Sequence, residues 1–265
     1  MDSLLVGNLD QDEPVLDLSN ISVNRSGQVI LRNIDLKIMK GDFVGLVGPN
    51  GSGKSTLLLT ILGALKASQG SIKIYGHNLH SRKLYGKIGW VSQAASNLPK
   101  TVCITVHELV KLGTVNAKNM FRLFDPERRR RVRHAIKMVG LEGVQNTDVS
   151  RLSGGQRQRA VIARALASDA DFILLDEPLV GIDRDARASL LKLLNQLCRN
   201  EGKTILMVSH DLAAMRQTAH RMVFLDETIH FDGKSNEFPE LMELAGIRGI
   251  GDIYSTPQFN PKEEE

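Results

Sequence analysis

One glycine-rich motif constrains this chain more than any other feature of its sequence. Residues 48–55 read Gly-Pro-Asn-Gly-Ser-Gly-Lys-Ser, a complete G-x-x-x-x-G-K-S pattern. The motif follows the compact apolar run Phe43–Val47 and opens a segment, Lys54–Leu65, for which we predict a helix. A glycine-rich turn between a buried strand and a helix points successive backbone N–H groups at phosphate oxygens, and the helix dipole adds to the attraction. The motif therefore predicts a phosphate-binding loop.

The same loop carries the side chains that a bound nucleoside triphosphate needs. The Lys54 ammonium can reach the β- and γ-phosphates, and the Ser55 hydroxyl can ligate Mg²⁺. We therefore predict ATP and Mg²⁺ as cofactors. The residues expected to contact the nucleotide are Gly48, Pro49, Asn50, Gly51, Ser52, Gly53, Lys54, Ser55 and Thr56.

The pattern of apolar residues predicts an α/β fold. Residues 15–38 alternate with a period of two, which is typical of antiparallel strands with one buried face. After residue 169 the chain alternates between strand and helix, with strands at 172–175 and 204–208 and a helix over 187–198. Residues 222–232 read as a closing hairpin that turns at Asp226-Glu227. Such alternation implies a mainly parallel sheet flanked by helices.

A largely helical segment, residues 94–161, reads as an insertion between the two halves of that sheet. Its best helix begins at Asp125, because Asp-Pro-Glu supplies an N-cap, a proline at the first helical position and an acid in the first turn. We expect residues 1–13 to be a lead-in, 14–235 to form one nucleotide-binding domain and 236–265 to be a tail.

Composition limits the setting of the protein. The chain has 265 residues, of which 42% are hydrophobic, so a sizeable core can form. Its two cysteines lack metal-ligand spacing, which favours a reducing, cytosolic compartment. The longest apolar stretch, Leu57–Leu65, is far shorter than the ~20 residues that span a membrane. The N-terminus lacks the features of a signal peptide. Any membrane link is therefore expected to come through a partner.

A second acidic motif supports the first. Phe172–Leu175 is a run of four apolar residues followed directly by Asp176 and Glu177. Ligands of open α/β sheets bind at the carboxyl ends of the strands, which is where these two acids emerge. Asp176 is placed to hold Mg²⁺, and Glu177 is placed to orient and deprotonate an attacking water.

A third motif predicts a dimer. Leu152-Ser-Gly-Gly-Gln156 precedes a helix expected over Arg157–Ala167, and such a turn at a helix N-terminus is a second phosphate-binding device. One chain then carries two γ-phosphate sites for one nucleotide. In a head-to-tail pair, each Ser153 turn would cover the partner's phosphate loop. The residues assigned to this site in trans are Leu152, Ser153, Gly154, Gly155 and Gln156.

Together these motifs make the chain resemble the nucleotide-binding subunit of an ABC transporter from about Val15 to Gly233. Residues 48–55 match Walker A, 152–156 the signature and 172–177 Walker B. The resemblance implies a P-loop NTPase core with an N-terminal antiparallel β subdomain and an inserted helical subdomain. It also implies partner permease subunits and a solute-binding protein in the same system.

The resemblance assigns three further residues. Gln93, in Trp-Val-Ser-Gln, matches the glutamine that contacts the γ-phosphate or Mg²⁺ through water. Asp183, in Gly-Ile-Asp, matches the loop through which the two subunits communicate. His210, in Val-Ser-His-Asp, matches the switch histidine, which together with Glu177 would be catalytic.

The chain departs from the family at the adenine site. An aromatic residue usually stacks on the base about two dozen residues before Walker A, but Asn24-Arg25 stands there in this chain. The Arg25 guanidinium could lie flat on the base. The alternative is a solvated arginine with no role in binding.

Two other features invite functional interpretations that we do not favour. The run Arg128–Arg131 suggests nucleic acid, but its helix keeps an apolar stripe and no aromatic residues are interleaved, so a solvated or lipid-headgroup-facing surface fits better. We therefore expect no nucleic-acid partner. His77 and His80 have no accompanying ligand cluster that would make a metal site.

Several functions share these motifs. A soluble ATPase acting on DNA or ribosomes would need a coiled-coil insertion or a second cassette, for which the chain has no room. A regulatory module without turnover is disfavoured by the intact Glu177 and His210. We favour a transporter ATPase at the cytoplasmic face of the membrane. Its sequence resembles importers of zinc, manganese or iron, and the alternative is a lipid or other small-solute system.

The force-transmitting contact with a permease is also predicted. The stretch from Gln93 to Val106 adjoins the expected nucleotide sensor, and we expect Leu98, Val102 and Ile104 to point outward. With the following helix they would form a groove for a short permease helix. The alternative is that these residues pack internally.

Overall fold

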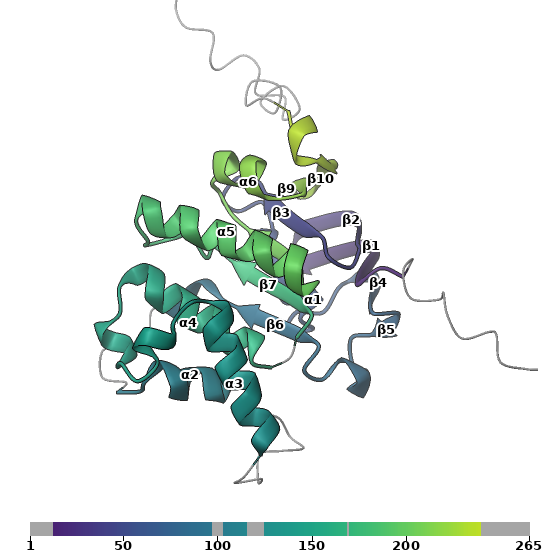
Figure 1. The fold of residues 1–265 in the computed structure, drawn as a ribbon. Helices are drawn as coiled ribbons and strands as arrows, with labels where there is room; N and C mark the ends of the chain where they lie inside the picture. The colour runs from purple at the N-terminus through teal and green to yellow at the C-terminus, as the bar shows by residue number, and fades with distance from the viewer. Residues whose placement is uncertain (1–12, 97–102, 116–124, 169, 240–265) are drawn as a thin grey trace, which may run out of the picture.

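The computed structural model describes residues 13–96, 103–115, 125–168 and 170–239. Within them the chain forms two sheets, with helices beside the larger sheet and a separate group of helices on one side of it (Figure 1). The predicted lead-in, 1–13, and tail, 236–265, lie almost entirely outside the described residues. The domain boundaries therefore stay predictions.

The smaller sheet is antiparallel, as the alternating pattern predicts. It has the strand order β2-β1-β4-β5. Its strands are β1 (Leu16–Arg25), β2 (Gln28–Ile38), β4 (Gln69–Ile74) and β5 (His77–Asn78). Strands β1 and β2 form a long hairpin that closes at Arg25 opposite Gln28. This turn brings Arg25 to the tip of the hairpin.

The larger sheet is mainly parallel. Its strand order is β10-β9-β3-β8-β7-β6, and only the β9–β10 pair is antiparallel. Its strands are β3 (Phe43–Val47), β6 (Ile88–Val91), β7 (Phe172–Asp176), β8 (Thr204–Val208), β9 (Arg221–Asp226) and β10 (Thr228–Lys234). All residues of β3 and β8 are buried, which explains why central strands are continuous apolar runs rather than alternating ones.

The core lies on both faces of the larger sheet. Phe172 and Leu174 point to the face covered by the antiparallel sheet and by α1 (Lys54–Ile61). Ile173 and Leu175 point to the opposite face, which is covered by the remaining helices. This alternation along β7 is the ordinary period of a strand, here buried on both sides.

The predicted helical insertion is confirmed. Helices α2 (Val106–Leu112), α3 (Pro126–Met138) and α4 (Gly154–Leu166) lie between β6 and β7 in the chain and pack against one another (Figure 1). As predicted, Asp125 caps α3 and Pro126 occupies its first position. Helices α5 (Arg184–Glu201) and α6 (Leu212–Thr218) contribute to the same core cluster as the insertion, on the face of the larger sheet opposite the antiparallel sheet.

Three predicted helix boundaries are wrong. Helix α1 ends at Ile61 rather than Leu65, because Gly63 adopts a positive φ of 73°. Helix α4 begins at Gly154 rather than Arg157, and α5 begins at Arg184 rather than Arg187. In both cases the polar residue before the helix, Ser153 or Asp183, caps it and so sets where the helix begins.

A close contact inside the insertion gives a test of its packing. A Cβ atom on Gly113, just after α2, would lie 1.8 Å from the carbonyl oxygen of Arg164 in α4. We expect Gly113→Ala to lower the free energy of unfolding by about 2–3 kcal/mol, because two backbones must separate. Gly143→Ala is the control, since nothing lies within 4 Å of its Cβ position. Denaturant unfolding with equal losses in the two variants would contradict this packing.

Candidate functional site

The phosphate loop has a backbone shape that depends on glycine. Gly48 and Gly53 have φ angles of 154° and 96°. A Cβ on Gly48 would lie 2.1 Å from the carbonyl oxygen of Leu225, and one on Gly53 would lie 2.5 Å from Leu31 Cδ2. The loop is therefore pressed between β9 on one side and β2 on the other. A side chain at either position would push the loop out of shape.

Lys54 is held inside this loop. Its Nζ donates hydrogen bonds to the carbonyl oxygens of Gly48 at 2.9 Å and Pro49 at 2.6 Å. Burial lowers the pKa of the ammonium group, although the carboxylates of Glu177 and Asp176 act in the opposite direction. Phosphate oxygens bound in the loop would add negative charge beside the buried ammonium group and favour its charged form.

Asp176 and Ser55 place two oxygen atoms together beside the loop. The Ser55 hydroxyl donates to Asp176 Oδ1 at 3.4 Å. Burial raises the pKa of the Asp176 carboxyl group, which the Ser55 hydrogen bond partly offsets. A hydroxyl and a carboxylate are the ligand types that Mg²⁺ prefers, and a cation would reverse the effect of burial on Asp176. These two residues fit a magnesium site.

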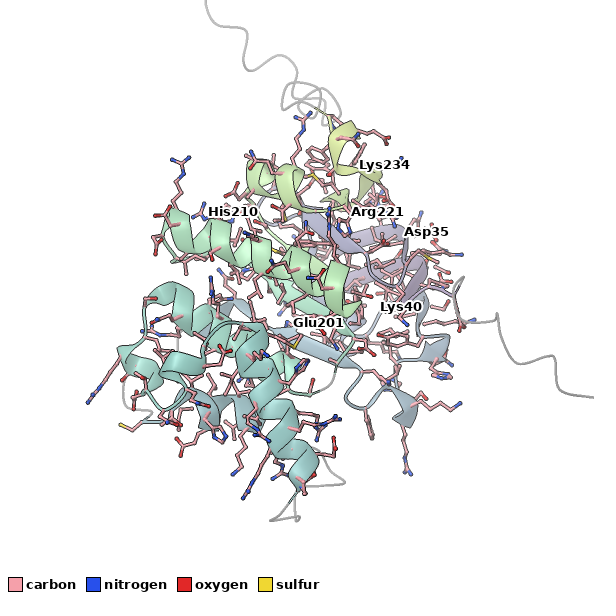
Figure 2. The ribbon with its side chains drawn as sticks, viewed as in Figure 1. Asp35, Lys40, Glu201, His210, Arg221 and Lys234 are labelled. Atoms are coloured by element: carbon pink, nitrogen blue, oxygen red, sulfur yellow. The ribbon has the colours of Figure 1, made fainter. Side chains whose placement is uncertain are left out.

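Glu177 and His210 form the contact at the centre of the site. His210 Nδ1 lies 2.8 Å from Glu177 Oε2. Glu177 has a φ of 51°, a left-handed conformation that is unusual for this residue, and its N–H donates to the Val208 carbonyl at 3.1 Å. The Glu177 side chain is 12% exposed, whereas that of His210 is 63% exposed. His210 follows β8, on the loop before α6 (Figure 2).

A cavity of about 640 Å³ joins most of the predicted residues. The phosphate loop forms one wall, and Gln93, Glu177 and His210 line the same space. Arg25 also lines it, from the tip of the β1–β2 hairpin. The structure therefore brings together the predicted nucleotide residues, including Arg25 at the adenine position, except that Gly48 and Pro49 do not line the cavity. Asp176 joins them through Ser55.

The predicted trans residues lie elsewhere in the chain. Ser153 forms a capping box with Gln156: its Oγ accepts the Gln156 N–H at 3.2 Å, and Gln156 Oε1 accepts the Ser153 N–H at 3.1 Å. None of residues 152–156 is among the described residues that line the nucleotide cavity. Ser153 and Gly154 are exposed, so they are available to another molecule.

Asp183 lies close to that turn. It caps α5 by accepting the Ala186 N–H at 2.9 Å. A Cβ on Gly155 would lie 2.6 Å from Ala186 Cβ, and one on Gly154 would lie 3.1 Å from the Gly181 carbonyl oxygen. The absence of side chains at 154 and 155 thus allows α4 to lie directly on the segment that carries Asp183.

The structure adds residues that the sequence did not identify. Ile30, Val180 and Val208 line the nucleotide cavity, but no role was assigned to them from the sequence. Arg187 Nη1 lies 2.9 Å from Asp211 Oδ2, and Asp211 is the N-cap of α6, directly after His210. This ion pair ties the start of α5 to the loop that carries the histidine. The only sequence signal for this ion pair is that Arg187 lies one helical turn after Asp183, on the expected helix that follows it.

The predicted permease groove is only partly described. Leu98 and Val102 lie outside the described residues. Ile104 is partly buried and packs against the larger core, and Val106 is fully buried. The prediction that Ile104 points outward is therefore wrong, because this side chain packs against the larger core.

Comparisons with known proteins agree with this geometry. The family model described as ABC transporter matches residues 31–180. The chain is 38% identical to the zinc uptake system ATP-binding protein ZurA of Listeria innocua over 84% of this chain and 87% of that protein. It is 36% identical to the manganese transport system ATP-binding protein MntA of Synechocystis over 84% of this chain and 86% of that protein.

A solved structure shares the fold as well as the sequence pattern. The ATP-binding cassette MJ0796, solved as a dimer in a post-hydrolysis state bound to ADP and Pi, superimposes with a TM-score of 0.68 at 32% identity. The match covers 84% of this chain and 100% of the MJ0796 chain. The cavity beside Gly48–Thr56 thus occurs in a fold that binds nucleotide.

The Arg187–Asp211 ion pair gives a test of how His210 is positioned. We expect Arg187→Gln to lower kcat for ATP hydrolysis about three- to tenfold with little change in KM, because Arg187 steadies the His210 loop without lining the cavity. Arg187→Lys should restore most of the rate. Lys203→Gln, which removes an ion pair of the same 2.9 Å length to Asp171, is the control. A KM effect, or an equal loss in the control, would contradict the assignment.

Proposed function

Since the chain belongs to the family of ABC transporter ATP-binding subunits, whose members hydrolyse ATP, we propose that it hydrolyses Mg·ATP to drive import of a divalent metal ion. The observation that carries this proposal is the cavity in which Lys54 lies at one wall and the Glu177–His210 contact at another. Such a cavity has groups that bind phosphate next to a group that can activate water.

The first step is binding of the triphosphate. The N–H groups of the phosphate loop surround the β- and γ-phosphates, and Lys54 exchanges its loop carbonyl partners for phosphate oxygens. Ser55 and Asp176 would hold Mg²⁺, with Gln93 reaching it through water. The metal, when bound, neutralises charge on the phosphates. Arg25, on the cavity wall, supports the base through its planar guanidinium.

The hydrolytic step belongs to Glu177. Its carboxylate accepts a proton from the water that attacks the γ-phosphorus, and the bond from that phosphorus to the bridging oxygen breaks. His210 holds the carboxylate in place through its 2.8 Å contact and, because it is mostly exposed, can also face the γ-phosphate. The left-handed backbone of Glu177 supports this role, because a strained conformation is retained where it positions a reacting group.

The second copy of the chain completes the site. We propose that Ser153, with Gly154 and Gly155, covers the γ-phosphate of the partner in a head-to-tail dimer, and that Asp183 carries contact between the two sites. The exposed capping box at the start of α4 supports this, as does the dimeric state of the related cassette MJ0796.

The proposal that the transported substrate is a metal ion is based on the related proteins. Two of them are named for zinc uptake and manganese transport, which favours a divalent metal such as zinc, manganese or iron over lipids or other solutes. No helix among the described residues is long and apolar enough to cross a membrane. We propose separate permease subunits, attachment through them to the cytoplasmic face, and a solute-binding protein in the same system.

Removing the proposed base gives the first functional test. Glu177→Gln keeps the size of the side chain but removes the carboxylate, so we expect ATP binding to be retained and hydrolysis to fall by about a hundredfold or more. A stable ATP-bound dimer should then be visible by size-exclusion chromatography. A variant that hydrolyses ATP at the wild-type rate would show that Glu177 is not the base.

The head-to-tail arrangement has its own test. Ser153→Arg should abolish hydrolysis while its own phosphate loop still binds ATP, because a bulky side chain cannot fit against the partner's γ-phosphate. Lys54→Ala should also be inactive, because its own phosphate loop is impaired while its Ser153 turn remains intact. Mixing the two variants should recover partial activity, since each mixed dimer contains one intact composite site. Full activity of the Ser153→Arg dimer alone would defeat the arrangement.

A further inference from the structure

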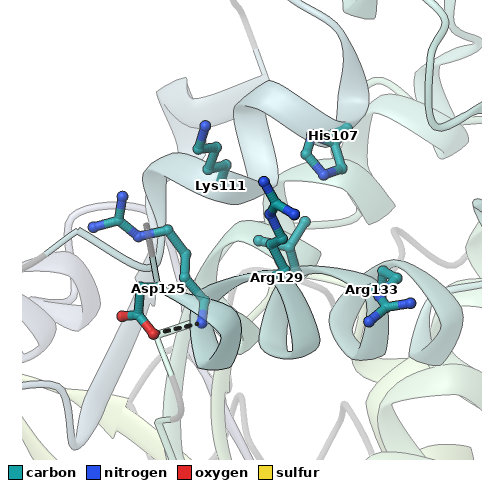
Figure 3. Close-up of a pocket in the computed structure, with 7 residues that line it drawn as sticks. His107, Lys111, Asp125, Arg129 and Arg133 are labelled. Atoms are coloured by element: carbon teal, nitrogen blue, oxygen red, sulfur yellow. Dashed lines mark hydrogen bonds between the residues drawn. The ribbon is translucent and has the colours of Figure 1, made fainter. Parts of the chain in front are cut away.

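A second cavity lies in the helical insertion and is strongly cationic. It has a volume of about 540 Å³ and lies between α2 and α3 (Figure 3). Its polar lining consists of His107 and Lys111 from α2, Asp125 before α3, and Arg128, Arg129 and Arg133 from α3. Figure 3 shows the Arg129 guanidinium extending toward α2, between Lys111 and His107. The described lining of this cavity shares no residue with that of the nucleotide cavity.

The acidic groups nearby are engaged in other contacts. The Asp125 carboxylate accepts the N–H groups of Glu127 at 3.0 Å and Arg128 at 3.2 Å. Glu127 pairs with Arg130 at 3.0 Å, on the outside of the cavity. Glu108, on α2, accepts the Thr105 N–H at 2.8 Å within a capping box. Each of these three carboxylates serves a helix start or a surface pair.

Three of the cations that line the cavity are not matched by an acidic side chain in the described chain. Within the described part of the chain, no acidic side chain forms a salt bridge with Lys111, Arg129 or Arg133. Arg129 and Arg133 are one helical turn apart, where like charges repel each other. The charges of Lys111, Arg129 and Arg133 around one hollow therefore repel one another, and a bound anion would offset that repulsion.

We propose that this pocket, defined by His107, Lys111, Arg128, Arg129 and Arg133, binds a phosphate-bearing anion of small-molecule size. Guanidinium groups bind phosphate oxygens in pairs, and an ammonium group adds a point charge. The volume lies within the range of small-ligand sites.

The position of the pocket would allow a bound anion to affect how the helices of the insertion pack together. It is formed by α2 and α3, and both helices pack against α4, whose first residue follows Ser153. An anion between α2 and α3 links two of the three helices that position the Ser153 turn. The ligand has two possible sources with the same chemistry, a soluble phosphate compound or the headgroup of an anionic phospholipid.

Binding of pyrophosphate tests the pocket directly. The measurement is isothermal titration of pyrophosphate into the full chain carrying Lys54→Ala, which weakens the phosphate loop as a competing site. We expect saturable binding, weakened about tenfold or more by the added pair Arg129→Gln and Arg133→Gln, because two charge-assisted contacts are lost. The matched control is Arg130→Gln with Lys137→Gln, which removes the same charge from α3 outside the pocket.

Co-sedimentation with vesicles separates the two sources. The probes are phosphatidylcholine vesicles with and without phosphatidylglycerol, tested with the pocket pair, the control pair and the unsubstituted chain. If the Arg129→Gln, Arg133→Gln variant loses pyrophosphate binding and the control variant does not, the ligand is a soluble phosphate compound. If the same variant instead loses phosphatidylglycerol-dependent binding and the control variant does not, the ligand is a lipid headgroup. The proposal fails if the unsubstituted pocket binds neither probe, or if the two pairs weaken binding equally, which would show a general charge effect. Thermal unfolding and ATP hydrolysis check that both pairs remain folded.

Discussion

The close approach of the phosphate loop to two strands is the constraint on which the rest of this structure depends. Gly48 touches the backbone of β9 at Leu225, and Gly53 touches β2 at Leu31. The turn between β9 and β10 adds a hydrogen bond from the Glu227 N–H to the Ser52 carbonyl at 3.2 Å. Because these strands belong to different sheets, the loop lies at the junction between them. Its shape is set by packing before any ligand binds, which is the condition for a preorganised electrostatic site.

The charges beside the loop are arranged for a ligand that carries both signs. Burial lowers the pKa of Lys54 and raises that of Asp176, so each group is disfavoured in its charged form. Phosphate oxygens beside Lys54 and a cation beside Asp176 would each reverse that effect. A triphosphate with its metal supplies both at once, whereas either alone would leave one buried charge without a partner. This electrostatic pattern supports Mg·ATP as the proposed ligand, independently of the motif.

The sequence predicted the parts of the molecule in which a local pattern has a single physical solution. The apolar run 172–175 followed by two acids favours a buried strand, and the glycine-rich loop 48–55 is typical of the turn that follows such a strand. Strand β6 escaped detection because it is four residues long, contains Gly89 and leaves Trp90 partly exposed at the edge of the sheet. The Arg187–Asp211 pair joins residues 24 positions apart, and its formation depends on how α5 and α6 pack. The cationic pocket likewise needs α2 and α3 side by side, although the arginine run itself was visible.

The packing of α4 on the Asp183 segment explains how a partner's nucleotide could affect this chain's own catalytic centre. Ser153 starts α4, and the glycines that follow it lie against Gly181 and Ala186. Asp183 lies between those two residues and caps α5, and Arg187, one turn into α5, holds the N-cap of α6 beside His210. The Ser153 turn and His210 are therefore connected by close backbone packing at Gly154 and Gly155, by the Asp183 cap and by the Arg187–Asp211 ion pair. A displacement of the Ser153 turn cannot be absorbed by side-chain rotation at positions 154 and 155, because no side chains are present there. We expect it to move the backbone at Asp183, and the Arg187–Asp211 ion pair connects that segment to the loop of the histidine that contacts Glu177.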